Sequence, residues 1–530
     1  MRARRWAWLA VAVVVVAAAA VRLRLLDVPL DRDEGEYAYF GQLLLEGVPP
    51  YAGAYNLKMP GIYGAYALVL AAFGQTPAGI RAGLILVTSA TTACMYLLGA
   101  RLGGTAIGVL AAVVFATQSL NPKLLGLAAY AEHFALLPVA AGALALLKAS
   151  TARRRFGLVA SGLLFGLALL VRQNTAFFVA GGALYLLAAA ADDSARSWTR
   201  RLTDAAIFLA WAAVPVALAA LGLLAAGTFG TFWFWVFVYA PHYHADLATG
   251  WTNLVRTLTA VAPSSSVALA LAAVGLGAVA RDPLRERRTI VLLLVAASAV
   301  GTMVGLQFRP HYFLLMLPAL ALLAGLGLGA LGDLLAARRS PALCWGVPAV
   351  LAVAALGQPL YASRPVLFEL GPTQVARAIY GRNPFPESLE IARYIREHSA
   401  AGDRVAVVGS EPQIYFYAGR RSATGYIYTY PLMELQPYAS AMQRQMIREI
   451  ESAAPRFLVF VSATRSWVVR PGSDQTIFGW FERYQRSFRR VGVADVLSQQ
   501  ETVYRWNDAA LAYSPRSDVW LMVFERGRQP

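Results

Sequence analysis

Long apolar stretches separated by short polar loops fill the first 360 residues of the chain. Scanned with a window of about 19 residues, these stretches predict about eleven membrane-spanning helices. The predicted spans lie near residues 6–21, 79–99, 104–120, 126–148, 156–171, 174–191, 205–226, 257–280, 289–306, 312–332 and 342–360. The first span follows three arginines and has no small-x-small cleavage site before Arg22, so we expect an uncleaved helix rather than a signal peptide.

The composition agrees with a multi-pass membrane protein. Of 530 residues, 58% are hydrophobic and only 15% are charged, and the mean hydropathy is +0.51. These values exclude a cytosolic enzyme and a disordered protein. A formal net charge of +17 would suggest nucleic acid in a soluble protein. Here most basic residues of the apolar part cluster in short loops, so they indicate topology instead.

The loops between the predicted spans divide into two chemically different sets. One set is basic and is expected to face the cytoplasm; it holds Arg2–Arg5, Arg101, Lys148, Arg153–Arg155, Arg196, Arg200, Arg201, Arg281–Arg288, Arg338 and Arg339. The other set mixes acids and bases; it holds Asp31, Asp33, Glu34, Glu36, Lys58, Glu132, Arg172, His242, His244, Asp246, Arg309 and His311. An odd number of spans then places the C-terminus outside.

The composition changes near residue 364. Residues 364–530 have the density of charge, Tyr and Pro that is typical of a water-soluble domain. The pattern predicts an amphipathic helix over Glu387–His398, a buried strand over Arg404–Val408, a helix over Gln443–Ser452 and a strand over Phe457–Val461. We therefore expect a transmembrane domain over residues 1–363 and an extracytoplasmic α/β domain over 364–530.

The first outer loop, residues 27–77, carries the most informative local pattern. Asp31 and Glu34 have the spacing of a capping box, so a helix is expected to start here. Tyr37, Phe40 and Leu44 then fall on one face, which would let this helix lie flat on the membrane surface. First-turn carboxylates also complement a helix dipole without any catalytic role, so spacing alone leaves both interpretations open.

Several motifs resemble one glycosyltransferase family. They are Asp33-Glu34 at the start of the outer loop, the element Lys58-Met59-Pro60-Gly61, the stretch from Arg309 to Pro318, and the Gly-Asp-Arg-Val-Ala-Val-Val-Gly segment of the outer domain. Together they are similar to the family-39 glycosyltransferases of the GT-C superfamily, which include protein O-mannosyltransferases and the lipid A aminoarabinose transferase. The resemblance implies a GT-C fold in the bacterial inner membrane and transfer of a sugar from a polyprenyl phosphate carrier.

This chemistry needs a base for the acceptor proton and cations for the departing phosphate. Asp33 is the candidate base, and Glu34 could equally serve or could orient the acceptor. Successive residues of a helix point about 100 degrees apart, so the two carboxylates cannot both face one atom. Glu132, near the outer end of the fourth span, is a further candidate acid, although it could also be a satisfied interfacial carboxylate.

Four basic residues reach the side of the membrane that normally avoids them, namely Lys58, Arg172, Arg309 and His311. An anionic lipid phosphate explains such a set, whereas a single basic residue at a span end can simply snorkel to the interface. With Tyr37 of the outer-loop helix, these residues form the predicted substrate-binding set.

An aromatic segment, Phe229–Trp251, precedes the eighth span. Its density of rings is typical of a belt at the level of the lipid headgroups, which fits better than a groove for the carrier. His242, His244 and Asp246 have a spacing that could bind a divalent metal ion, the one cofactor that the sequence suggests. Short His clusters in loops are usually not metal sites.

The sequence thus predicts an inverting glycosyltransferase that moves a monosaccharide from a polyprenyl-phosphate donor to a glycan, lipid or protein of the cell envelope. Two alternatives remain open: a ligase or polymerase acting on lipid-linked oligosaccharides, and a transporter or flippase for lipid-linked sugars. A transporter should carry inverted repeats and polar residues near mid-membrane, whereas the ionisable residues here gather at the outer ends of the spans.

Overall fold

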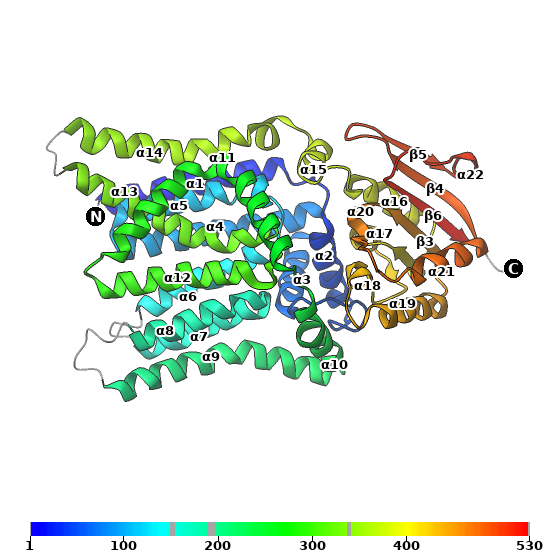
Figure 1. Ribbon diagram of the computed structural model, residues 1–530, viewed down its shortest axis with the longest axis horizontal. Helices are drawn as coiled ribbons and strands as arrows, with labels where there is room; N and C mark the ends of the chain where they lie inside the picture. Colours follow the sequence, from blue (N-terminus) through cyan, green and yellow to red (C-terminus); the bar gives the residue numbers. More distant parts are fainter. Residues whose placement is uncertain (1, 149–153, 189–196, 337–340, 528–530) are drawn as a thin grey trace.

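The computed structural model describes residues 2–148, 154–188, 197–336 and 341–527. Two parts are evident in Figure 1, a bundle of long helices and a smaller part built around a β-sheet. The helices α2, α3 and α10 lie at the junction between the two parts. The chain is therefore a polytopic helical membrane protein with a C-terminal soluble domain, as the hydropathy pattern predicts.

Each predicted span coincides with a helix of the bundle. These helices are α1 (Arg2–Arg24), α4 (Pro77–Gly103), α5 (Thr105–Gln118), α6 (Ala131–Lys148), α7 (Arg154–Val171), α8 (Ala176–Ala188), α9 (Trp198–Ala225), α11 (Leu247–Ala280), α12 (Arg285–Met303), α13 (Leu317–Ala336) and α14 (Pro341–Ala362). Over the described residues, eight helices are long and apolar enough to cross a membrane. The predicted spans 104–120, 174–191 and 342–360 correspond to α5, α8 and α14.

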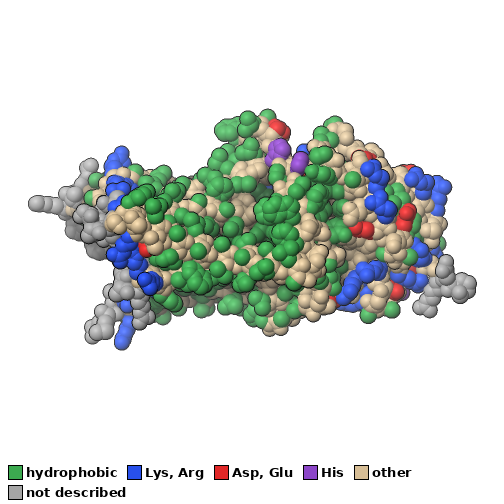
Figure 2. All heavy atoms as spheres, turned by 90° about the horizontal axis from the view of Figure 1, so that it is seen from below, with side chains coloured by type: hydrophobic (Ala, Val, Ile, Leu, Met, Phe, Trp, Pro, Cys, Tyr) green, Lys and Arg blue, Asp and Glu red, His purple; other side chains and the backbone are tan. Residues whose placement is uncertain are grey.

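The two ends of the bundle differ in charge. Figure 2 shows Lys and Arg side chains gathered at the end away from the soluble domain, with apolar side chains covering the length between. The N-terminus and the turn between α11 and α12 lie at this basic end, whereas α2 and α10 lie at the other (Figure 1). Arg153, Arg196, Arg338 and Arg339 of the predicted basic set lie outside the described residues.

The soluble domain is a six-stranded sheet with the order β2-β1-β3-β6-β4-β5. Its strands are β1 (Arg404–Val408), β2 (Arg421–Ser422), β3 (Phe457–Ser462), β4 (Phe488–Val496), β5 (Thr502–Trp506) and β6 (Trp520–Arg526). Strand β1 pairs in parallel with β2 and β3, and the remaining pairs are antiparallel. The strands predicted at 404–408 and 457–461 are confirmed, and so are the predicted helices, as α16 (Phe385–Glu397) and α19 (Ala439–Ala453).

Helices cover both faces of this sheet, because the residues of β1 alternate between two cores. Val405 and Val407 pack in a cluster that includes α16 and also α2 and α3 of the first outer loop. Ala406 and Val408 pack on the opposite face with α19 and with α21 (Thr476–Tyr484). One hydrophobic core is thus continuous between the soluble domain and the outer loop, which fixes the two to each other.

The outer loop contains α2 (Arg32–Leu45) and α3 (Pro60–Phe73). The predicted capping box is confirmed: the Asp31 side chain accepts a hydrogen bond from the Glu34 amide, and the Glu34 side chain accepts one from the Asp31 amide. Helix α2 lies at the junction between the bundle and the soluble domain, but its apolar face does not rest on the membrane surface. Tyr37 and Phe40 are buried, and α2 packs between α3 and α17 (Gln413–Ala418) of the soluble domain.

The aromatic segment is divided between two environments. It forms α10 (Phe229–Trp233) and a π-helical turn, η4 (Phe234–Tyr239). Trp235 and Tyr239 are buried against the soluble domain, and the Tyr239 hydroxyl donates to Glu434. Trp233 and Phe237 remain exposed. Only part of the segment is therefore available for the predicted headgroup belt, since the rest ties the bundle to the soluble domain.

Shorter elements complete the soluble domain and the connections. They are α15 (Pro372–Tyr380), α18 (Tyr430–Met433), α20 (Thr464–Trp467), α22 (Asp508–Ala512), and the turns η1 (Pro122–Leu124), η2 (Gln173–Thr175), η5 (Ala240–His242), η6 (Val304–Leu306), η7 (Pro310–Met316), η8 (Pro365–Glu369) and η9 (Gln485–Ser487).

The charge difference between the two ends predicts the orientation in the membrane. In a chain with Cys94 and Cys344 replaced by Ala, a membrane-impermeant maleimide added to intact cells should label Asp508→Cys on the soluble domain. It should leave Arg281→Cys, at the basic end, unlabelled until the cells are opened, because basic loops stay inside. Labelling of Arg281→Cys alone in intact cells would contradict the assignment.

Candidate active site

The ammonium group of Lys58 lies between two carboxylates of α2. Its Nζ is 2.5 Å from Oδ1 of Asp33 and 2.9 Å from Oε2 of Glu36. The two acids are three residues apart on the helix and so share a face. Nζ also lies 4.5 Å from the centre of the Tyr37 ring. Asp33 and Lys58 each keep about a fifth of their side chain exposed, whereas Glu36 is fully buried.

Lys58 is held in place through its backbone and its neighbours. The Tyr51 hydroxyl donates to the carbonyl of Lys58 at 2.5 Å, and the Gln173 amide donates to the carbonyl of Leu57 at 3.0 Å. Gly61 lets α3 start directly against the end of α7, because a Cβ there would lie 2.4 Å from the carbonyl oxygen of Leu170. The Lys58–Gly61 element therefore has one position relative to α7.

The charges around Asp33 keep it ionised. Burial alone would raise the pKa of Asp33, but Lys58, His311 and Arg172 outweigh burial and hold this pKa below its usual range. The pKa of Glu36 moves the other way: burial raises it to about 7, despite the favourable contact with Lys58. Of the two carboxylates on Lys58, Asp33 is thus the more exposed one and the more fully ionised one at neutral pH.

A second buried ion pair faces this cluster from the bundle. Nη2 of Arg172 lies 3.0 Å from Oε1 of Glu132, whose side chain is fully buried. The guanidinium of Arg172 also lies 4.7 Å from the centre of the Tyr312 ring. The His311 ring stacks on Tyr130 at 4.3 Å. Six of the predicted residues therefore come together at the junction of the bundle and the soluble domain: Asp33, Tyr37, Lys58, Glu132, Arg172 and His311.

Glu34 belongs to a different interaction. It is fully buried and forms an ion pair with Arg81 of α4, with a second contact of 2.9 Å between Nη2 and Oε2. The amide of Ala129 also donates to its Oε1 at 2.6 Å. These contacts make Glu34 a residue that fastens α2 to the bundle. Its role as an alternative base stays a prediction. The sequence signal for its partner was an arginine within an otherwise apolar span.

Two further residues lie near this cluster, one from the loop before η7 and one from the soluble domain. Arg309 is exposed and has no ion-pair partner among the residues that the structure describes. It lies within electrostatic reach of Tyr312 and His311. Tyr428, which the sequence did not single out, extends from the soluble domain so that its ring centre lies 5.9 Å from the Lys58 Nζ. The site is therefore built from both parts of the chain.

The predicted metal site is not formed. Nδ1 of His242 and Nδ1 of His244 face backbone carbonyls of Val238 and Pro241, and the Asp246 side chain caps α11 by accepting from Thr249. Within the described ranges, the structure gathers no group of three or more His, Cys, Asp or Glu side chains suited to a metal ion. Asp246 has the N-terminal capping role that Asp favours.

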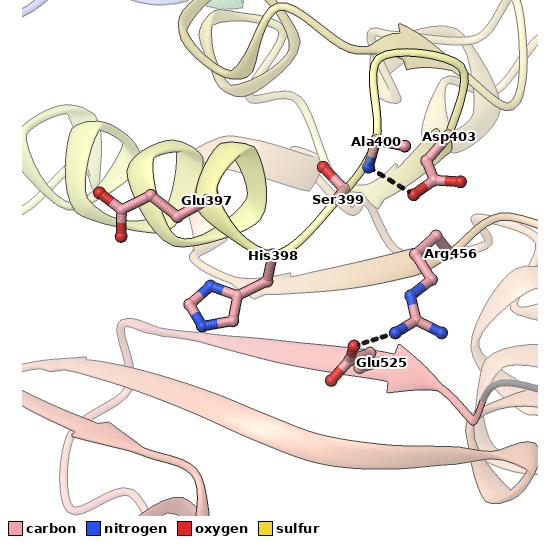
Figure 3. A pocket seen from close by; sticks show the side chains of 7 residues that line it. All are labelled: Glu397, His398, Ser399, Ala400, Asp403, Arg456 and Glu525. Carbon is pink, nitrogen blue, oxygen red and sulfur yellow. Dashed lines mark hydrogen bonds and ion pairs between the residues drawn. The ribbon is translucent and has the colours of Figure 1, made fainter.

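A separate polar pocket lies on the soluble domain (Figure 3), at the edge where β1 and β3 begin and β6 ends. Two of its charged groups have partners within the pocket: Asp403 accepts from the Ala400 amide at 2.8 Å, and Arg456 pairs with Glu525. Glu397 pairs with Arg393 outside it. The active-site cluster is at the opposite end of β1, where the chain continues to Glu411 and α17. We assign this pocket no part in the chemistry.

Comparison with known proteins identifies the architecture. Residues 59–221 match the family described as dolichyl-phosphate-mannose-protein mannosyltransferase. Among solved structures, ArnT from Cupriavidus metallidurans bound to undecaprenyl phosphate aligns over 96% of this chain and 99% of its own, at 15% identity and a TM-score of 0.65. The chain has the GT-C fold.

Other comparisons agree with the GT-C fold. ArnT in the apo state aligns over 97% of this chain and all of its own, with 16% identity and a TM-score of 0.58. The oligosaccharyltransferase AglB from Archaeoglobus fulgidus, in complex with an inhibitory peptide and a dolichol-phosphate, aligns over 96% of this chain and 75% of its own, with 13% identity and a TM-score of 0.55. A search of curated proteins finds no match.

The ion pair of Glu34 predicts a stability effect. Glu34→Gln leaves Arg81 buried without a counter-charge, so the free energy of unfolding should fall by roughly 3 kcal/mol or more. Glu46→Gln is the matched control, since Glu46 follows α2 and pairs with Arg421 at an exposed site; its cost should stay below about 1 kcal/mol. Equal melting temperatures for the two purified variants would contradict the structural role.

Proposed function

We propose that this chain transfers a monosaccharide from a polyprenyl-phosphate donor to an acceptor of the cell envelope, on the membrane face that carries the soluble domain. The observation that carries the proposal is the partly exposed, ionised carboxylate of Asp33, which lies beside the cations Lys58 and Arg172. An ionised carboxylate among cations suits a reaction in which a proton is removed and a phosphate departs.

The comparisons support the same class of donor. The matching family is named for a dolichyl-phosphate-mannose substrate, and two proteins of the same fold were solved with undecaprenyl phosphate and with dolichol-phosphate. A polyprenyl phosphate needs an apolar route for its chain and cations for its head. A cluster of charged residues at one end of an apolar bundle offers both.

The proposed reaction is a single displacement. The acceptor oxygen forms a bond to the anomeric carbon while Asp33 takes its proton, and the bond from that carbon to the phosphate oxygen breaks. The electron pair leaves with the polyprenyl phosphate, and the configuration at the anomeric carbon inverts. Because phosphate is already a good leaving group, the cations stabilise the departing charge and no acid needs to protonate it.

The cations are not equivalent in this proposal. Lys58 has three N–H donors, of which Asp33 and Glu36 take two, so one remains for a phosphate oxygen. Arg172 already forms an ion pair with Glu132 and lies over the Tyr312 ring. Arg309 is exposed and has no acidic partner in the described chain; its side chain bonds Tyr243, which leaves further N–H donors for the phosphate.

The role of Asp33 predicts a loss of turnover without a loss of fold. Asp33→Asn keeps the size of the side chain, and Asp31 rather than Asp33 caps the helix. General-base assistance is worth roughly 10²–10⁴-fold, so turnover should fall at least 100-fold while donor binding and melting temperature change little. Near wild-type transfer by purified Asp33→Asn protein would remove Asp33 from the mechanism.

The role of Arg309 predicts a weaker donor interaction. Arg309→Ala removes a charge-assisted contact worth about 2 kcal/mol, so the KM for the polyprenyl-phosphate donor should rise roughly 30-fold. Arg364→Ala is the control, because Arg364 is also exposed but pairs with Glu369 on the soluble domain side. The same donor KM in both variants would reduce Arg309 to an interfacial anchor.

A further inference from the structure

The turn of α2 that carries Asp33 is also bound to the soluble domain. The guanidinium of Arg32, the residue before Asp33, donates to Oε1 of Glu411 at 2.7 Å and to Oδ1 of Asn383 at 2.9 Å. It also lies 5.2 Å from the centre of the Phe385 ring. Both charged side chains are buried, Arg32 at 8% exposure and Glu411 at 0%.

Glu411 is itself rigidly placed. It follows the buried strand β1 by three residues, and its second carboxylate oxygen accepts from the Ser466 hydroxyl at 2.7 Å. The same hydroxyl oxygen accepts from the Ser410 amide at 2.8 Å. The carboxylate that holds Arg32 is therefore fixed by the core of the soluble domain.

Helix α2 and the soluble domain remain in close contact beyond Arg32. A Cβ at Gly35 would lie 2.6 Å from the Cβ of Gln413, so the helix approaches α17 as closely as a glycine allows. One turn later, the Ser422 amide donates to the Tyr39 hydroxyl oxygen at 2.7 Å. Any shift of the soluble domain at this contact is passed to the first turns of α2.

We propose that Arg32 and Glu411 are positioning residues, through which the soluble domain sets the place of Asp33 and Glu36 against Lys58. Successive residues of a helix point about 100 degrees apart, so Arg32 can bind the soluble domain while Asp33 faces the site. Without the Glu411 charge, the buried guanidinium of Arg32 has no counter-charge. It can regain hydration only if the first turn of α2 moves.

Hydrogen–deuterium exchange of the full-length protein in detergent tests this proposal whatever the reaction is. Glu411→Gln should speed exchange of amides in the first two turns of α2 at least about tenfold, because local opening becomes easier. Glu46→Gln removes an exposed ion pair between the α2 region and the soluble domain, and should leave those amides at the wild-type rate. Wild-type exchange in Glu411→Gln would overturn the proposal.

A second readout rests on the proposed function. With an undecaprenyl-phosphate-linked sugar as donor, kcat of Glu411→Gln should fall at least about tenfold with donor KM within about twofold, while Glu46→Gln matches wild type. A wild-type protein that transfers no sugar would contradict the proposed function alone, since exchange still decides the positioning role. An active Glu411→Gln protein with wild-type kcat would overturn the positioning role alone.

Arg32→Lys covers the case in which Glu411→Gln does not fold. Lysine keeps a positive charge opposite Glu411 but cannot reproduce the paired contacts to Glu411 and Asn383. The amides of the first turn of α2 should again exchange faster, and kcat should fall with donor KM unchanged. Wild-type exchange together with wild-type kcat in this variant would overturn the proposal.

Discussion

Burial of a short, highly charged segment is the constraint on which the rest of this structure depends. Five of the six residues from Asp31 to Glu36 are ionisable, and most of this segment is buried. Buried charge is costly unless it is paired. The pairing partners come from four different places: Tyr130 beside α6, Glu411 in the soluble domain, Lys58 in the outer loop and Arg81 in α4.

These ion pairs differ in how far they are buried. In the ion pairs of Arg32 and Glu34 both partners are buried; the first pair joins α2 to the soluble domain and the second joins it to the bundle. The pair of Asp33 with Lys58 alone stays partly exposed. Two buried ion pairs therefore hold the helix on either side of Asp33, and in the proposed function the partly exposed pair is the one that faces the substrate. A polar segment that is costly to bury thus gives a rigid support to one accessible carboxylate.

Local patterns made much of the fold predictable. Hydrophobic runs located each bundle helix, the capping box of Asp31 and Glu34 located the start of α2, and alternating apolar residues located β1 and β3. The i, i+3 spacing of Asp33 and Glu36 also places them on one face of the helix. These signals succeed because their physical cause lies within a few residues of the chain.

The partners across the chain were not predictable in the same way. Arg81 and Glu411 lie 47 and 379 residues from Glu34 and Arg32, and no local period connects such pairs. The same limit explains why the apolar face of α2 was expected to lie against the membrane surface. Its apolar face looked suited to lipid, but α3 and the soluble domain cover it, and only the assembled fold supplies that cover.

A structure of the protein with undecaprenyl phosphate tests the central claim most directly. The phosphate is predicted at the soluble-domain end of the bundle, within hydrogen-bond distance of Arg309 or Lys58 and next to the Asp33 carboxylate. The lipid chain is predicted to run along the apolar helices. A phosphate bound at the basic end of the bundle, or away from Asp33, would contradict the assignment of this cluster as the site of transfer.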